Sequence, residues 1–79
     1  MTPELFYEIS DAGSAAARRL VIELGILELV RFRNVFYDEA QADLRAHGGS
    51  QLPALWNGET LVEGEEAVLS ALRRLAPAP

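Results

Sequence analysis

The sequence contains no cysteine. A disulfide framework, thiolate metal ligation and thiol–disulfide exchange by this chain are therefore excluded. Lysine is also absent, and the seven basic residues, all arginine, against twelve acidic residues leave a net charge of −5. Nucleic acids and anionic membranes attract clustered basic surface, so we expect neither as a partner.

Long apolar runs are missing as well. No run approaches the roughly 20 residues of a membrane span, and residues 1–4 lack the basic region of a signal peptide, so we expect a cytoplasmic protein.

His47 is the only histidine, with no second ligand at helical spacing, and no metal site is predicted. The length of 79 residues predicts a single domain, residues 1–76, followed by a frayed Pro/Ala tail at 77–79.

The clearest pattern in the sequence is a β-hairpin. Leu52–Trp56 and Thr60–Val62 are short apolar runs typical of strands. Asn57 and Gly58 between them favour the positive φ angles of a tight two-residue turn. Because proline cannot donate to a sheet ladder, Pro53 at the strand entrance requires an edge, a bulge or a special peptide bond.

A helix is predicted after Gly64, where the apolar period changes from two residues to 3.6. Glu65 and Glu66 fall in its first turn, where the helix dipole favours negative charge. The apolar stripe of this helix comprises Val68, Leu69, Leu72 and Leu75.

The first half of the chain predicts two strands and two helices. Gly25 stands where a left-handed helix cap is expected, and Asp38 with Gln41 fits a capping-box pattern. The predicted order is β-α-β-α-β-β-α, an α/β (α+β) fold with a four-stranded mixed sheet flanked by three helices. The predicted elements are a strand at Leu5–Ile9, a loop at Ser10–Ser14, a helix at Ala15–Leu24, an edge strand at Ile26–Phe36 parallel to the first, and a helix at Asp38–Ala46.

The second half of the sequence resembles the thioredoxin-like superfamily. Leu-Pro-Ala-Leu, an Asn-Gly turn, a short strand and Gly-Glu-Glu-Ala-Val opening a terminal helix are similar to glutaredoxins and to the amino-terminal domain of glutathione S-transferases. The resemblance implies that Pro53 is cis. It also implies that the backbone of Leu52 binds a thiol ligand such as glutathione.

The resemblance places the family's Cys-Pro-Tyr-Cys motif on residues 11–14, where both thiols are replaced. Asp11 is most simply a helix cap, because aspartate and serine are leading capping residues. Ser14 is the one candidate catalytic residue, since its hydroxyl could donate to a glutathione sulfur. A serine in a first helical turn more commonly caps the helix or faces solvent, so glutathione transferase activity stays an open alternative.

The resemblance also assigns the ligand's other end to the start of the last helix. Glu66 would pair with the amine of glutathione, while Glu65 replaces the serine that usually holds its carboxylate. Two glutamates at this place are also ordinary partners of the helix dipole. The basic residues available for a carboxylate, which a solvated face explains equally well, are Arg18, Arg19, Arg31 and Arg33.

Two functions therefore remain. The first is a non-redox binding module that uses the groove beside Pro53 for a peptide or protein partner, or the exposed second-strand edge for a peptide or a second copy of the chain. The second is a glutathione-binding, transferase-like domain with Ser14 facing the thiol. The candidate ligand-binding residues are Asp11, Ser14, Leu52, Pro53, Glu65 and Glu66.

Overall fold

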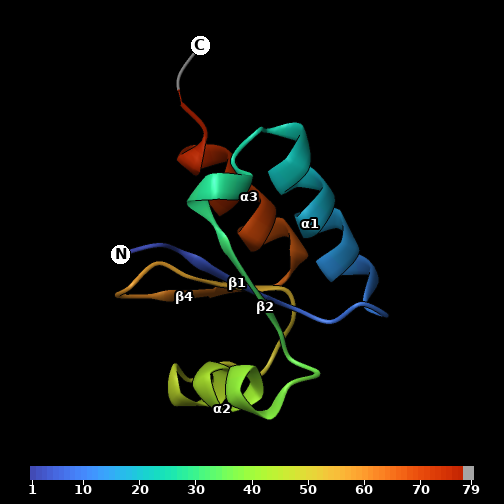
Figure 1. Ribbon diagram of the computed structural model, residues 1–79, viewed down its shortest axis with the longest axis vertical. Helices are drawn as coiled ribbons and strands as arrows, with labels where there is room; N and C mark the ends of the chain where they lie inside the picture. Colours follow the sequence, from blue (N-terminus) through green and yellow to red (C-terminus); the bar gives the residue numbers. More distant parts are fainter. Residues whose placement is uncertain (78–79) are drawn as a thin grey trace.

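The computed structural model describes residues 1–77, and its helices cover both faces of a single sheet (Figure 1). α1 and α3 lie side by side on one face, and α2 covers the other. No helix among the described residues is long or apolar enough to cross a membrane. The elements are β1 (Glu4–Tyr7), α1 (Ala12–Glu23), a 3₁₀ turn η1 (Leu27–Leu29), β2 (Arg31–Asn34), α2 (Asp38–Ala46), β3 (Ala54–Trp56), β4 (Leu61–Glu63) and α3 (Glu65–Leu75).

The four strands form one mixed sheet in the order β2-β1-β3-β4. β1 and β2 are parallel, with Leu5 opposite Phe32, whereas β3 is antiparallel to both β1 and β4. The parallel strands β1 and β2 are joined by a crossover connection that contains α1. The predicted fold class, element order and edge position of the second strand are confirmed.

The core is divided by the sheet into two clusters. Successive side chains of a strand point to opposite faces, so Leu5 packs beneath α1 and α3 while Phe6 packs beneath α2. Both side chains are fully buried. The larger cluster comprises Leu5, Ala17, Val21, Ile26, Val30, Leu55, Val68 and Leu72, and the smaller comprises Phe6, Val35, Ala40, Leu44 and Ala54.

The predicted strand at Ile26–Phe36 is wrong in its first half. Gly25 ends α1 with a φ of +68°, and the chain then makes the 3₁₀ turn η1, in which Leu29 N–H donates to the carbonyl of Ile26 at 2.8 Å. The high β propensity of this apolar stretch was misleading, because the chain must turn from the helix layer back to the sheet. β2 is left with only four residues.

Other predicted boundaries shift by a few residues. The first strand ends at Tyr7 instead of Ile9, α1 begins at Ala12 instead of Ala15, and both hairpin strands start later than predicted. Asp38 lies in the first turn of α2, whose N-cap is Tyr37, so the predicted capping box is wrong. α3 ends at Leu75, and the last two residues of the predicted tail, 78 and 79, lie outside the described residues.

The hairpin turn is longer than the two residues predicted. Trp56 pairs with Leu61, so four residues separate the paired positions, and only Gly58 has a positive φ, of +102°. Asn57 acts through its side chain, whose oxygen accepts the backbone N–H groups of Glu59 and Thr60, each at 2.9 Å. This local bonding replaces the left-handed backbone conformation that Asn57 was expected to adopt.

Arg33 is buried, although its edge strand predicted a solvated side chain. Only 8% of its surface is exposed, and its guanidinium pairs with Glu4 and, at 2.6 Å, with Asp43 of α2. The hydrogen bond to Asp43, and then the bond to Glu4, raise the pKa of Arg33 against the opposing effect of burial. The correction arises because α2 covers the face of β2 on which Arg33 lies, so this cation joins α2 to the sheet.

Candidate functional site

The candidate site lies where β1 and β2 end and β3 begins. In open sheets ligands bind outside the carboxyl ends of parallel strands, which here are Tyr7 and Asn34. β3 is antiparallel to β1, so its first residue, Ala54, and the preceding Pro53 come to the same edge. The loops that follow β1 and β2 and the loop that precedes β3 therefore form this edge, which we call the loop edge.

Asp11 caps α1, as its residue type predicted. Its backbone is extended, and its carboxylate accepts the N–H of Ser14 at 2.7 Å. The carboxylate thus occupies the amino terminus of its own helix, where the dipole and the free amide groups favour an anion. An anionic ligand at this terminus would have to displace Asp11.

Ser14 is fully buried. Its hydroxyl oxygen accepts the backbone N–H of Glu8 at 3.2 Å and so ties the loop after β1 to the first turn of α1. The candidate catalytic hydroxyl therefore lies inside the protein, where its hydrogen bond to Glu8 holds the loop after β1 against α1.

The loop before β3 presents an unpaired stretch of backbone. The peptide bond between Leu52 and Pro53 is cis, and the carbonyl of the buried Pro53 accepts the N–H of Gly64 at 2.9 Å. Among residues 1–77, the N–H and the C=O of Leu52 have no hydrogen-bond partner. A donor and an acceptor of the main chain therefore remain free at the loop edge.

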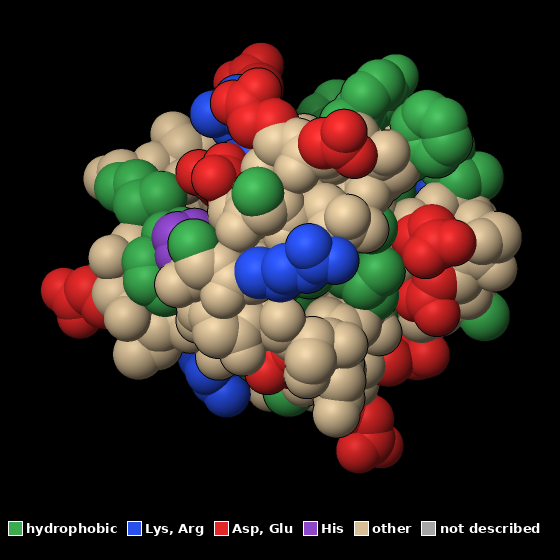
Figure 2. All heavy atoms as spheres, turned by 90° about the horizontal axis from the view of Figure 1, so that it is seen from below, with side chains coloured by type: hydrophobic (Ala, Val, Ile, Leu, Met, Phe, Trp, Pro, Cys, Tyr) green, Lys and Arg blue, Asp and Glu red, His purple; other side chains and the backbone are tan. Residues whose placement is uncertain are grey.

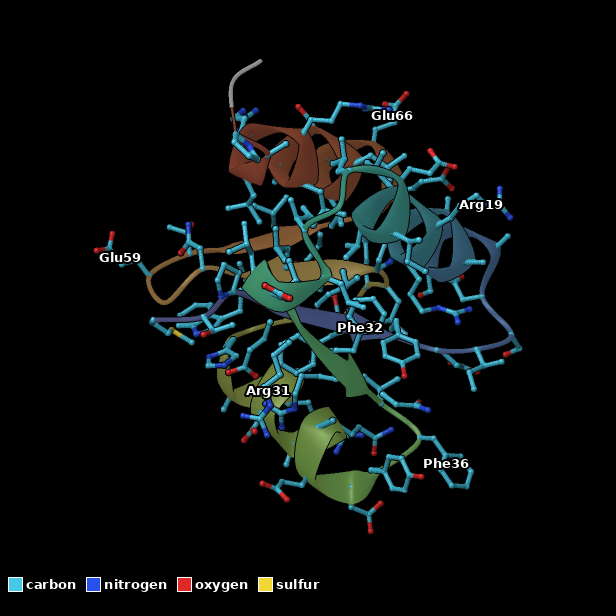
Figure 3. The ribbon with its side chains drawn as sticks, turned by 45° about the horizontal axis from the view of Figure 1, so that its top comes forward. Arg19, Arg31, Phe32, Phe36, Glu59 and Glu66 are labelled. Carbon is cyan, nitrogen blue, oxygen red and sulfur yellow. The ribbon has the colours of Figure 1, made fainter. Side chains whose placement is uncertain are left out.

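The starts of α1 and α3 meet at Pro53. A Cβ atom built on Gly13 would lie 3.1 Å from Cδ of Pro53 and 3.2 Å from Oε1 of Glu65, so only glycine allows this approach without displacement. The structure thus brings the loop of Asp11, Pro53 and Glu65 together. Glu66 stands apart, on the exposed outer side of α3 (Figure 3).

Glu63 holds the loop that leads to Leu52, a role that the sequence did not indicate. Its carboxylate accepts the backbone N–H groups of Ser50 at 2.7 Å and Gln51 at 2.8 Å. These two donors lower the pKa of Glu63 below its ordinary value. The end of β4 therefore positions the chain immediately before the unpaired Leu52.

An apolar hollow of about 420 Å³ opens on the loop edge. Ile9 follows β1 and Phe36 and Tyr37 follow β2, and their exposed fractions are 68%, 80% and 64%. Large apolar side chains that are exposed together in loops indicate an interaction surface. This surface was not predicted from the sequence, because Ile9 and Phe36 were assigned to strands. Figure 2 shows hydrophobic side chains gathered at one end of the α2 side of the molecule.

A second hollow of about 210 Å³ adjoins the first, since Glu8 lines both. It lies between Leu52 and the side chains of Leu44 and Arg45 on α2. Together the two hollows form a groove that runs from Leu52 past Glu8 to Phe36, which we call the loop-edge groove. Two charged residues line this groove, the acidic Glu8 and the basic Arg45.

No protein-family model matches the sequence, and no curated protein matches it. Among solved structures, the chain is similar to the glutaredoxin-like protein NrdH-redoxin from Escherichia coli. The two share 28% sequence identity with a TM-score of 0.78, and the match covers 100% of each chain. The full coverage and the TM-score show that the two chains share the same overall fold. The chain therefore belongs to the thioredoxin-like superfamily, with a fold similar to that of a glutaredoxin-like protein, and it contains no cysteine.

Proposed function

We propose that this chain is a non-redox binding module that holds an extended segment of a peptide or protein partner in the loop-edge groove. The observation that carries this proposal is the unpaired N–H and C=O of Leu52 at one end of the loop-edge groove, whose other end is the apolar hollow. An extended segment gains affinity from main-chain hydrogen bonds and specificity from pockets for alternate side chains. Both parts are available here.

The main chain of the partner pairs with Leu52. The N–H and C=O of one residue form the two bonds of an antiparallel pair, with the partner as an added strand. The bonds of Glu63 to Ser50 and Gln51, and of Gly64 to Pro53, fix this loop before a partner arrives. A fixed loop reduces the ordering cost of binding.

The side chain of the partner enters the hollow beside Ile9 and Phe36. A volume of about 420 Å³ is at the small end of ligand pockets and accommodates one large apolar or aromatic side chain. Because Ile9 and Phe36 are more than half exposed, covering them removes apolar surface from water. This burial supplies the main favourable free energy of the complex.

The similarity to NrdH-redoxin does not extend to thiol chemistry in this chain. NrdH-redoxin has a thioredoxin-like activity profile, whereas the loop after β1 and the start of α1 here carry Asp11 and Ser14 and no cysteine. Glutathione is a less suitable ligand than a peptide. The carboxylates of Asp11 and Glu65 oppose an anionic tripeptide, and the Ser14 hydroxyl is buried.

The test is selection of peptides from a random decapeptide library displayed on phage, followed by amide NMR titration with the enriched peptides. We expect saturable shifts at Leu52, Ile9 and Phe36. Ile9→Ser should weaken binding by about 10–100-fold, because burial of an isoleucine contributes about 1.5–3 kcal/mol. The matched control is Ile22→Ser, since Ile22 is equally exposed, at 65%, but lies on α1.

Binding that is unchanged in Ile9→Ser, or shifts that avoid Leu52, would refute the groove as the binding site. A parallel titration with reduced glutathione separates the two ligand classes. Saturable shifts at the starts of α1 and α3 with glutathione, and none with enriched peptides, would favour the thiol ligand instead.

A further inference from the structure

The outer edge of β2 is an unpaired strand edge. β2 has β1 as its single neighbour in the sheet, and Figure 1 shows β2 crossing the front of the molecule with no element outside it. Arg31 N–H donates to Pro3 and Val35 N–H donates to Tyr7, so the intervening Phe32 and Asn34 direct their backbone groups outward. Tyr37 N–H bonds the carbonyl of Asn34 at 3.1 Å. The N–H and C=O of Phe32 and the N–H of Asn34 remain for another chain.

Exposed apolar side chains stand at both ends of this edge. Leu27 and Leu29 of η1 precede β2 and are 55% and 47% exposed, while Phe36 and Tyr37 follow it. Natural edge strands are usually protected by charges, prolines or a covering segment. An edge that is flanked by apolar residues at both ends is instead suited to pairing.

Two opposite charges lie along the same edge. Arg31 at the start of β2 and Glu39 in the first turn of α2 are both exposed, and both line a hollow of about 370 Å³ beside the strand. Within residues 1–77, neither has an ion-pair partner. Arg33, by contrast, is occupied by Glu4 and Asp43. Arg31 and Glu39 are thus the charges of this edge that a partner can pair with.

We infer that the β2 edge binds a second copy of this chain, with the two strands antiparallel across a two-fold axis. This symmetry sets the start of one edge against the end of the other. Leu27 and Leu29 of one copy then face Phe36 and Tyr37 of its partner, and Arg31 faces Glu39. Because each copy carries both members of each complementary pair, the apolar contact and the ion pair each form twice in the dimer.

The association is weak. The strand has four residues, and the acidic Glu28 and Asp38, which also flank the edge, approach each other across the axis. Short polar interfaces fall at the small end of specific contacts. We expect a dissociation constant on the order of 10–100 µM. Figure 3 shows Arg31 and Phe32 leaving the strand on different sides, so the charge and the aromatic ring do not compete for the same space.

The experiment is sedimentation velocity of the full chain between about 5 µM and 1 mM. Arg31→Glu and Glu39→Arg should each raise the dissociation constant about tenfold, because each change places like charges in contact twice. The double variant Arg31→Glu with Glu39→Arg should restore it to within about twofold of the native value. Arg19→Glu, an exposed position on α1, is the matched control and should leave association unchanged.

A native chain that stays monomeric throughout this range would overturn the inference. Single charge reversals without effect, or a double variant that fails to regain association, would also overturn it. Restoration in the double variant cannot arise from a folding defect. The β2 edge and the loop-edge groove share Phe36 and Tyr37. Arg31 and Glu39 do not line the groove, so the charge reversals test self-association separately from peptide binding.

Discussion

Glu63 provides the sharpest test of how the candidate site is built. Its carboxylate bonds the N–H groups of Ser50 and Gln51, and within residues 1–77 these amides have no other acceptor. Hydrogen bonds to charged groups contribute about 1.5–3 kcal/mol when buried, but this loop is exposed and water replaces the lost acceptor. We therefore expect Glu63→Ala to reduce the free energy of unfolding by about 1 kcal/mol.

Urea denaturation measures this change, with the single tryptophan, Trp56, as the fluorescent probe. With a denaturant slope of about 1 kcal/mol per molar urea for a chain of this size, the midpoint should fall by about 1 M. Amide hydrogen exchange at Ser50 and Gln51 should accelerate about fivefold. The control is Glu59→Ala at the exposed tip of the hairpin, which Figure 3 shows projecting into solvent.

The pH dependence gives an independent check on Glu63. Its folded-state pKa lies below the ordinary value of about 4.5, because the two N–H donors favour the ionised carboxylate. Its stabilising contribution is present above the unfolded-state pKa and is lost as the pH falls through the folded-state pKa. The stability difference between the native chain and Glu63→Gln should therefore shrink below about pH 4.5. Native exchange rates at Ser50 and Gln51 in Glu63→Ala would refute this reasoning.

Two further substitutions test the buried polar contacts. Ser14→Ala should lower the free energy of unfolding by about 1 kcal/mol, because the Glu8 N–H loses its acceptor. Urea denaturation checks this against the exposed control Ser70→Ala. If Ser14→Ala is as stable as the native chain, the bond to Glu8 does not stabilise the fold. Glu4→Gln should cost about 2 kcal/mol, because Arg33 is buried and keeps only Asp43 as a charged partner. A loss no greater than that of the exposed control Glu28→Gln in thermal melts would contradict this account.

The order of elements could be predicted because each carries its own signal. The period of α3, the Asn-Gly turn and the glycine after α1 are local features, and local features define local structure. The strand wrongly predicted at 26–30 shows the limit of such local signals, since apolar residues such as Leu27 and Leu29 occur in a 3₁₀ turn as well as in a strand. What distinguishes the two is the position of α1 above the sheet, which depends on contacts distant in sequence.

The candidate site was predicted only in part, for a related reason. Asp11 was correctly interpreted as a cap. That Pro53 and Glu65 both approach Gly13 was not predicted. The apolar groove was missed because exposure of Ile9 and Phe36 is a tertiary property. Arg33 and Glu63 act on residues at least ten positions away in the sequence, and no spacing rule identifies such partners.

The division of the core has a consequence for motion. α2 is anchored by the smaller cluster, chiefly Ala40 and Leu44, and by the bond of Asp43 to Arg33, whereas α1 and α3 share the larger cluster. Elements with fewer buried contacts open at lower free energy than the whole domain. We therefore expect α2 to undergo local unfolding while the opposite layer stays intact. One wall of the loop-edge groove can then adapt to different occupants without loss of the fold.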